Sequence, residues 1–147
     1  MKVLFLGTSG VHHPLVAANL FTGRFLSHDL RMIKGFCDSY YDESGDPIYV
    51  AEDSSGNEVY ALGVGSEVEV GQRSIEGLRE LLGCTSQDLV VKSIFLPGEK
   101  VMYYMNKIPK SLGGKHINMF VSNIIIKRNF KQIKKLVDDL QAEILVH

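Results

Sequence analysis

The chain has 147 residues, of which 45 % are hydrophobic, and a formal net charge of −1, so we predict one domain with a single core over residues 1–147. The apolar run Val3–Leu6 ends at Gly7 and is too short for a signal-peptide core or a membrane span, so we expect a cytoplasmic protein with no membrane partner. Cys37 and Cys84 lie far apart without Cys-x-x-Cys spacing, which indicates neither a disulfide framework nor a cysteine zinc site.

The chain opens with a short strand, a glycine loop and a helix. Lys2–Leu6 is typical of a strand that is buried on both faces in the middle of a parallel sheet. Proline is favoured in the first turn of a helix and glycine just after its end. We therefore predict a helix from about Pro14 to Thr22, with Gly23 following it.

The next segment predicts a long loop and a hairpin. Residues 24–47 have no clean period and are rich in turn formers, so they predict a loop with a short helix near Asp29–Ile33. Pro47–Glu52 and Glu58–Gly63 are two strand-forming runs joined by a turn, which predicts a β-hairpin.

The second half of the chain predicts alternating helices and strands. Ser66 and Glu69 fit a capping box at the start of a helix that runs to Gly83. In the remaining segments, the spacing of the apolar residues predicts which are strands and which are helices. Their predicted order is strand, helix, strand and helix over Leu89–Leu96, Glu99–Ile108, Ile117–Ile126 and Asn129–Leu145.

This order of elements predicts the fold class. We expect a three-layer α/β/α sandwich, Rossmann-like, with a mainly parallel sheet and an inserted β-hairpin. Right-handed crossovers place helices on both faces of such a sheet. Ligands bind outside the carboxyl ends of its strands, and the first strand ends at Gly7. The loop from Gly7 to His13 is therefore the predicted ligand site.

The loop Gly7-Thr-Ser-Gly-Val-His-His-Pro14 lies where a Walker A loop would lie. A phosphate-binding loop of that kind needs Gly, Lys and Ser or Thr where this chain has His12, His13 and Pro14. The G-x-G-x-x-G spacing of the dinucleotide fingerprint is absent as well. Both interpretations are therefore rejected.

A simpler anion site is compatible with the same residues. Hydroxyl groups, glycines that allow close backbone approach and the positive end of a helix dipole all favour negative charge. We predict that the loop binds a phosphorylated or otherwise anionic small molecule. The predicted ligand-binding residues are Gly7, Thr8, Ser9, Gly10 and His13.

The two adjacent histidines suggest chemistry at this loop. His12 and His13 can each act as a hydrogen-bond donor, an acid/base or a phosphate nucleophile near neutral pH. In a catalytic protein, His12 would be the acid/base or nucleophile. The alternative is that one imidazole caps the helix and the other is half exposed, with no chemistry. The residues leave open whether the protein is an enzyme, and they identify no cofactor.

Two other site chemistries draw on the same loop and the segment that follows. A metal site would need ligands from the long loop, namely Cys37, Asp38, Asp42 or His28, and no spacing fixes that geometry, so no metal is predicted. A nucleophilic pair of Cys37 and His12 has no surrounding signature.

Charge is segregated along the chain. Residues 36–91 carry twelve acidic and two basic residues, and residues 92–135 carry ten basic residues and one acidic residue. Either the two halves complement each other within one fold, or they form a dipolar surface that steers a charged partner. No basic motif with interleaved aromatic residues accompanies the lysines, which argues against a nucleic-acid partner. The second hypothesis is a non-enzymatic assembly protein that forms homo-oligomers or binds a protein partner.

Several motifs together resemble a known family. They are Gly7-Thr-Ser-Gly-Val-His12, Leu15-Val-Ala-Ala18, Gly35-Phe-Cys-Asp38 and Gly56-Asn-Glu-Val-Tyr-Ala-Leu-Gly63. The chain thereby resembles the domain of unknown function 3189 family, small uncharacterised proteins of endospore-forming bacteria. That resemblance implies no activity, but it suggests a sporulation setting for an assembly role.

The same resemblance points to two site residues. His12 matches the family's histidine, and Asp38 matches the aspartate of a Tyr-Phe-Asp element. We therefore predict His12 and Asp38 as the catalytic pair, with Asp38 orienting the imidazole. His13 and Pro14 stand where the family has two serines, which removes two hydroxyls from a phosphate cradle.

Overall fold

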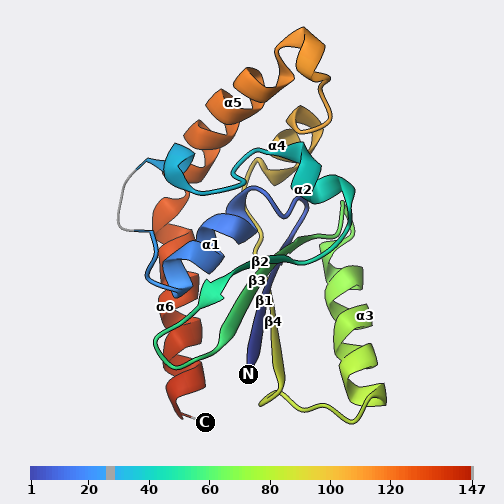
Figure 1. The fold of residues 1–147 in the computed structure, drawn as a ribbon, viewed down its shortest axis with the longest axis vertical. Coiled ribbons are helices and arrows are strands. Elements are labelled where there is room, and N and C mark those ends of the chain that lie inside the picture. The colour runs from blue at the N-terminus through green and yellow to red at the C-terminus, as the bar shows by residue number, and fades with distance from the viewer. Residues whose placement is uncertain (26–28, 147) are drawn as a thin grey trace.

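A four-stranded sheet forms the centre of the protein in the computed structural model, which describes residues 1–25 and 29–146 (Figure 1). The strand order is β2-β3-β1-β4. The central strand β1 (Lys2–Gly7) runs parallel to both β3 (Glu58–Gly63) and β4 (Leu89–Ser93), and β2 (Ile48–Glu52) runs antiparallel to β3. The predicted mainly parallel sheet is confirmed.

Both faces of β1 are buried, as its apolar run predicts. Alternate side chains of a strand point to opposite faces of the sheet. Val3 and Phe5 belong to the larger hydrophobic cluster, and Leu4 and Leu6 belong to a smaller one. The strand therefore needs a helical layer on each side.

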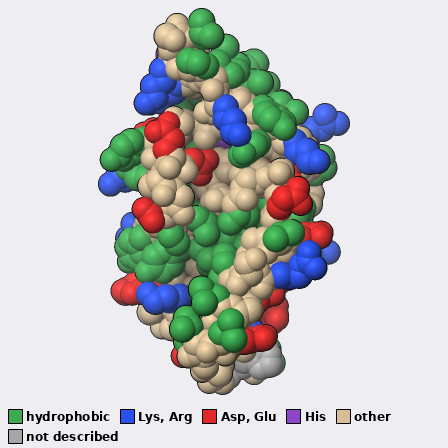
Figure 2. All heavy atoms as spheres, turned by 90° about the vertical axis from the view of Figure 1, so that its right-hand side faces the viewer, with side chains coloured by type: hydrophobic (Ala, Val, Ile, Leu, Met, Phe, Trp, Pro, Cys, Tyr) green, Lys and Arg blue, Asp and Glu red, His purple; other side chains and the backbone are tan. Residues whose placement is uncertain are grey.

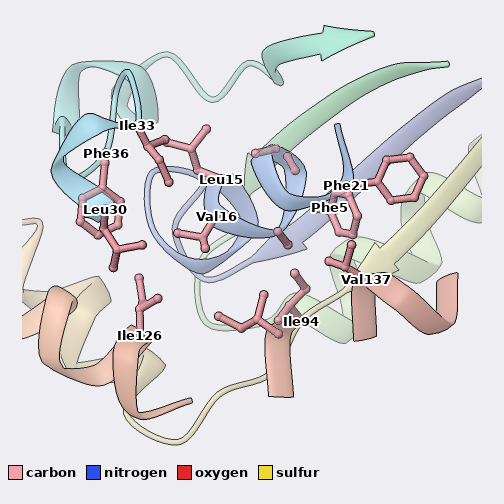
Figure 3. Packing of buried hydrophobic residues seen from close by; sticks show 14 of the residues in the cluster. Phe5, Leu15, Val16, Phe21, Leu30, Ile33, Phe36, Ile94, Ile126 and Val137 are labelled. Carbon is pink, nitrogen blue, oxygen red and sulfur yellow. The ribbon is translucent and has the colours of Figure 1, made fainter. Parts of the chain in front are cut away.

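The larger cluster lies between the sheet and two helices. These are α1 (His13–Phe21) and α6 (Phe130–Val146), both at the predicted positions. Figure 3 shows Phe5 of the sheet close to Phe21 of α1 and Val137 of α6, and the two phenylalanine rings make an edge contact with centroids 5.7 Å apart. On the other face lies α3 (Val68–Leu81), which completes the three layers of an α/β/α sandwich (Figure 1).

The predicted hairpin is also confirmed. β2 and β3 pair in the antiparallel direction, and Tyr49 lies opposite Tyr60 with ring centroids 5.4 Å apart. The hairpin is part of the main sheet rather than an appendage, because its second strand forms the parallel pair with β1.

The long loop before the hairpin contains two short elements. A 3₁₀ turn at Leu30–Met32 lies where a short helix is predicted. The helix α2 (Ser39–Glu43) is not predicted, and none of its five residues is buried. The side chain of Asp38 caps α2 by accepting a hydrogen bond from the backbone N–H of Tyr40, at 3.2 Å.

Three predicted boundaries are wrong. The capping box is absent because Glu67, not Ser66, is the residue before α3, and no side chain caps this helix. The strand predicted over Leu89–Leu96 ends at Ser93, and the helix that follows, α4, spans Glu99–Met105. The turn Lys110–Leu112 then leads into the next helix.

The strand predicted over Ile117–Ile126 is a helix, α5 (Gly114–Arg128). Its isoleucines and valine favour a strand by propensity. Its buried positions instead recur every four residues, as on one face of a helix, and most are not apolar. They are Gly114, Asn118, Ser122 and Ile126.

Across residues 1–25 and 29–146, no helix combines the length with the apolar composition that crossing a membrane requires.

Candidate functional site

A pocket of about 700 Å³ opens at the carboxyl ends of β1 and β3. Gly63, the last residue of β3, lines it together with Thr8 and Gly65 from the loops that follow the two strands. The strand order changes direction at β1, because β3 lies on one side of it and β4 on the other. In open α/β sheets, ligands bind at the carboxyl ends of the strands where the order changes direction. The pocket therefore lies where the fold predicts a ligand site.

Asp42 is the most extensively bonded side chain of this pocket. Its carboxylate accepts hydrogen bonds from the hydroxyl of Ser9, from the backbone N–H of Gly10 at 2.7 Å and from the amide of Asn106 at 2.9 Å. Burial raises the pKa of Asp42, and the three donors partly offset that effect. Two groups of the predicted anion loop thus bind a carboxylate of the chain itself.

Two glycines make room for this carboxylate. A Cβ on Gly63 would lie 2.5 Å from the backbone nitrogen of Gly10 and 2.9 Å from Oδ1 of Asp42. A Cβ on Gly10 would lie 2.8 Å from the nitrogen of Gly63. The loop after β1 and the end of β3 therefore touch through their backbones, and neither position accepts a side chain without movement.

A chain of hydrogen bonds connects Asp42 to His12. Oδ1 of Asn106 accepts from Nδ2 of Asn118, and Oδ1 of Asn118 lies 2.9 Å from Nε2 of His12 and accepts from the hydroxyl of Ser122. An ionised carboxylate can only accept, so Asp42 fixes the orientation of Asn106 and, through it, that of Asn118. It follows that His12 carries its proton on Nε2 and donates it to Asn118.

His12 and His13 are both fully buried, each 0 % exposed, and neither lines the pocket. Nε2 of His13 lies 3.1 Å from the carbonyl oxygen of Ile94, to which it donates, and 3.6 Å from the carboxylate of Glu99. Burial lowers the pKa of His12 to about 4 and that of His13 to about 3. Both imidazoles are therefore neutral at pH 7, and neither caps α1.

The other predicted residues have separate surroundings. Thr8 is buried but lines the pocket, with its hydroxyl 3.5 Å from the carbonyl oxygen of Glu99. A Cβ on Gly7 would lie 2.5 Å from both Nε2 of His13 and Cγ of Pro14, so this glycine allows α1 to approach β1. Asp38 caps α2, and the described partner of the His12 imidazole is Asn118.

The segment after α4 supplies the basic wall of the pocket, which sequence reasoning missed. Lys107 and Lys110 line it together with Tyr103 and Asn106. Nζ of Lys107 lies 4.2 Å from the centroid of the Tyr103 ring, a cation–π contact that limits where the ammonium group can lie. The available signal was the basic composition of residues 92–135, which locates no single lysine.

The alternative site chemistries find no supporting geometry among the described residues. No group of three or more His, Cys, Asp or Glu side chains within 1–25 and 29–146 is arranged to hold a metal ion, and His28 lies outside these residues. Cys37 is buried, and burial raises the pKa of its thiol to about 12. A thiol with that pKa is not the thiolate that nucleophilic catalysis needs.

The hydrogen-bond chain predicts a measurable change in Asp42→Asn. The new amide presents an N–H₂ group where Asp42 only accepts, so Asn106 and Asn118 must reverse to keep their bonds. His12 is then expected to move its proton from Nε2 to Nδ1, which the ¹⁵N chemical shifts of the imidazole report. Asp46→Asn, an exposed site in the same loop, is the control and should leave the shifts unchanged. An unaltered His12 tautomer in a folded Asp42→Asn protein would contradict the inferred chain.

Comparison with protein families identifies a match for the chain. The sequence model of a family described as "Protein of unknown function (DUF3189)" matches residues 2–142. No curated protein and no solved structure matches the chain. Because the match covers nearly all of the sequence, including the whole sheet and the pocket, the chain belongs to the DUF3189 family of uncharacterised proteins.

Proposed function

We propose that the protein binds a phosphorylated small molecule in the pocket at the carboxyl ends of β1 and β3. The observation that supports this most is the pair Lys107 and Lys110 in the lining of a pocket that Thr8 also lines. Ammonium groups bind phosphate oxygens through charge-assisted hydrogen bonds, and a hydroxyl can add a further donor. The volume of about 700 Å³ is that of an ordinary small-molecule site.

The pocket contains acids as well as bases. Asp42 and Glu43 line it beside the two lysines. Carboxylates repel a phosphate but accept hydrogen bonds from hydroxyl groups. A ligand with an anionic end and a hydroxylated end, such as a sugar phosphate or a nucleoside monophosphate, satisfies both kinds of wall.

The residues that line the pocket favour Asp42 over His12 as the acid/base group. His12 is fully buried, and hydrogen bonds through Asn118 and Asn106 connect it to the pocket. Asp42 lines the pocket and has a raised pKa, which is typical of carboxyl groups that transfer protons. In any proton transfer to a bound ligand, Asp42 is the proposed acid/base and His12 a positioning residue.

Removing either lysine's charge is expected to weaken binding. Lys107→Gln and Lys110→Gln should each lower the affinity for inorganic phosphate and glucose 6-phosphate about fivefold, as for the loss of a solvent-exposed ion pair worth about 1 kcal/mol. Isothermal titration calorimetry at low salt measures this effect. Lys131→Gln and Lys134→Gln, on the exposed side of α6, are the matched controls. Equal weakening in the control variants, or no binding of either probe by the unmodified protein, would overturn the proposal.

A further inference from the structure

A cavity of about 280 Å³ lies beside β2, the strand at which the order of the described sheet ends. We call it the edge cavity. Three elements contribute to its lining, namely β2 with residues 48–50, α1 with Leu15 and Asn19, and α2 with Tyr41. Among the described residues, none lines both this cavity and the pocket at the carboxyl ends of β1 and β3. The edge cavity is therefore a separate place at which a ligand could bind.

The edge cavity has an apolar floor. Ile48 and Val50 are half-buried and pack against the larger hydrophobic cluster, to which the buried Leu15 belongs. The ring of Tyr41 lies on Gly35, because a Cβ on that glycine would lie 3.4 Å from two of the ring carbons. Gly35 has a φ of 83°, in the left-handed region that favours glycine. Contacts with the rest of the protein thus hold the floor in place before any ligand binds.

The rim of the edge cavity is positively charged. Arg24 and Lys34 line it, and no Asp or Glu is found among its described lining residues. A guanidinium N–H of Arg24 donates to the carbonyl oxygen of Val50 at 3.4 Å, so this charge lies beside β2. Within residues 1–25 and 29–146, no ion pair joins either cation to a carboxylate. On the α3 side of the molecule, by contrast, acidic and basic side chains are interspersed (Figure 2).

The free edge of β2 is poorly suited to an added peptide strand. The register of its pairing with β3 shifts between Tyr49 and Ala51, and such irregularities on edge strands oppose further strand pairing. The carbonyl oxygen of Val50, which lies between these two residues, already accepts the hydrogen bond from Arg24. The volume of the cavity is just below the range of sites for drug-sized ligands, so its occupant is a small molecule.

We propose that the edge cavity binds a small organic acid in which an anionic head is joined to an apolar body, such as an aromatic carboxylate. The planar guanidinium of Arg24 can bind a carboxylate through two hydrogen bonds, and Lys34 adds a second positive charge. The side chains of Ile48 and Val50 and the ring of Tyr41 then remove the apolar body from water. This site does not depend on the phosphate site proposed above, because the two cavities have different linings.

Titration with benzoate at constant ionic strength, followed by backbone amide chemical shifts, tests the proposal. Saturable shifts are expected at Asn19, Tyr41 and Val50. Benzyl alcohol has the ring without the charge, and acetate has the charge without the ring. Each should bind about fivefold more weakly than benzoate or weaker still, because each lacks one of the two interactions.

Substitution of the two cations assigns the binding to the rim. Arg24→Gln and Lys34→Gln should each weaken benzoate binding about fivefold, as for the loss of one exposed ion pair. Lys131→Gln, at an exposed position on α6, is the matched control and should bind benzoate normally. Circular dichroism establishes that each variant is folded.

Three results would overturn the proposal. Benzyl alcohol that binds as tightly as benzoate would show an apolar crevice without anion recognition. Benzoate shifts confined to Thr8 and Gly63 would place the carboxylate in the pocket at the ends of β1 and β3. An absence of saturable benzoate shifts would show that the edge cavity is not a binding site, and it would leave phosphate binding at the other pocket unaffected.

Discussion

Lowering the pH from 7 to 5 is expected to remove about 4 kcal/mol from the free energy of unfolding, because His12 and His13 are buried in their neutral form. Their pKa values of about 4 and about 3 lie below the ordinary 6.5 of an unfolded chain. Between these values the unfolded state binds more protons than the folded state, so stability falls as the pH falls. Each histidine contributes about 2 kcal/mol at pH 5. Urea denaturation at pH 7, 6 and 5 measures the change.

Two comparisons assign this effect to the buried pair. The imidazole resonances of His12 and His13 should remain those of the neutral form down to pH 5, and His116→Gln, at an exposed position on α5, should leave the pH dependence unchanged. Asp42 acts in the opposite direction, because its raised pKa favours the folded state as its carboxyl is protonated. Constant stability from pH 7 to 5, or His12 and His13 resonances that titrate near pH 6.5, would contradict the burial of these side chains.

Gly63→Ala is expected to destabilise the fold by about 3 kcal/mol, the upper range for an overpacked site. The added Cβ would lie 2.5 Å from the nitrogen of Gly10 and 2.9 Å from Cα of Ser9, and neither backbone atom can move without separating the loop from β3. The hydrogen bond from Gly10 to Asp42 should be lost with it. Thermal and urea denaturation measure the loss of stability.

Gly77→Ala is the matched control in the same protein. It lies within α3, and a Cβ there has no heavy atom within 4 Å. Replacing an unstrained helical glycine by alanine stabilises a protein by roughly 0.5–1 kcal/mol. Opposite signs for Gly63→Ala and Gly77→Ala are therefore expected, and equal effects of the two changes would contradict the close approach of the loop to β3.

Periodicity predicted the elements whose buried faces are apolar. The run Val3–Leu6 predicted a central strand, and the spacing of apolar residues predicted α6, because both elements face the hydrophobic core. The same reasoning failed for α5, where Asn118 and Ser122 face inward and Ile117 and Ile124 are exposed. Apolar period predicts secondary structure only where the buried face is the apolar face.

For the candidate site too, the features that depend on neighbouring residues could be predicted, and the contacts between residues far apart in the sequence could not. The strand, loop and helix around Gly7 predicted a ligand site at the end of β1 from neighbouring residues alone, and a pocket that Thr8 lines lies at that end. The contacts of Asp42 with Ser9 and Gly10 join residues more than thirty positions apart, through an unpredicted helix. Likewise, the burial of His12 depends on α5, whose type was predicted wrongly.

Mapping of backbone amide chemical shifts during titration with inorganic phosphate tests the central claim most directly. The proposed pocket predicts saturable shifts concentrated at Thr8, Gly63, Gly65 and Lys107, with larger shifts at the same amides for glucose 6-phosphate. Saturable shifts confined to other surfaces, or none with either probe, would contradict the assignment of the pocket at the carboxyl ends of β1 and β3 as an anion site.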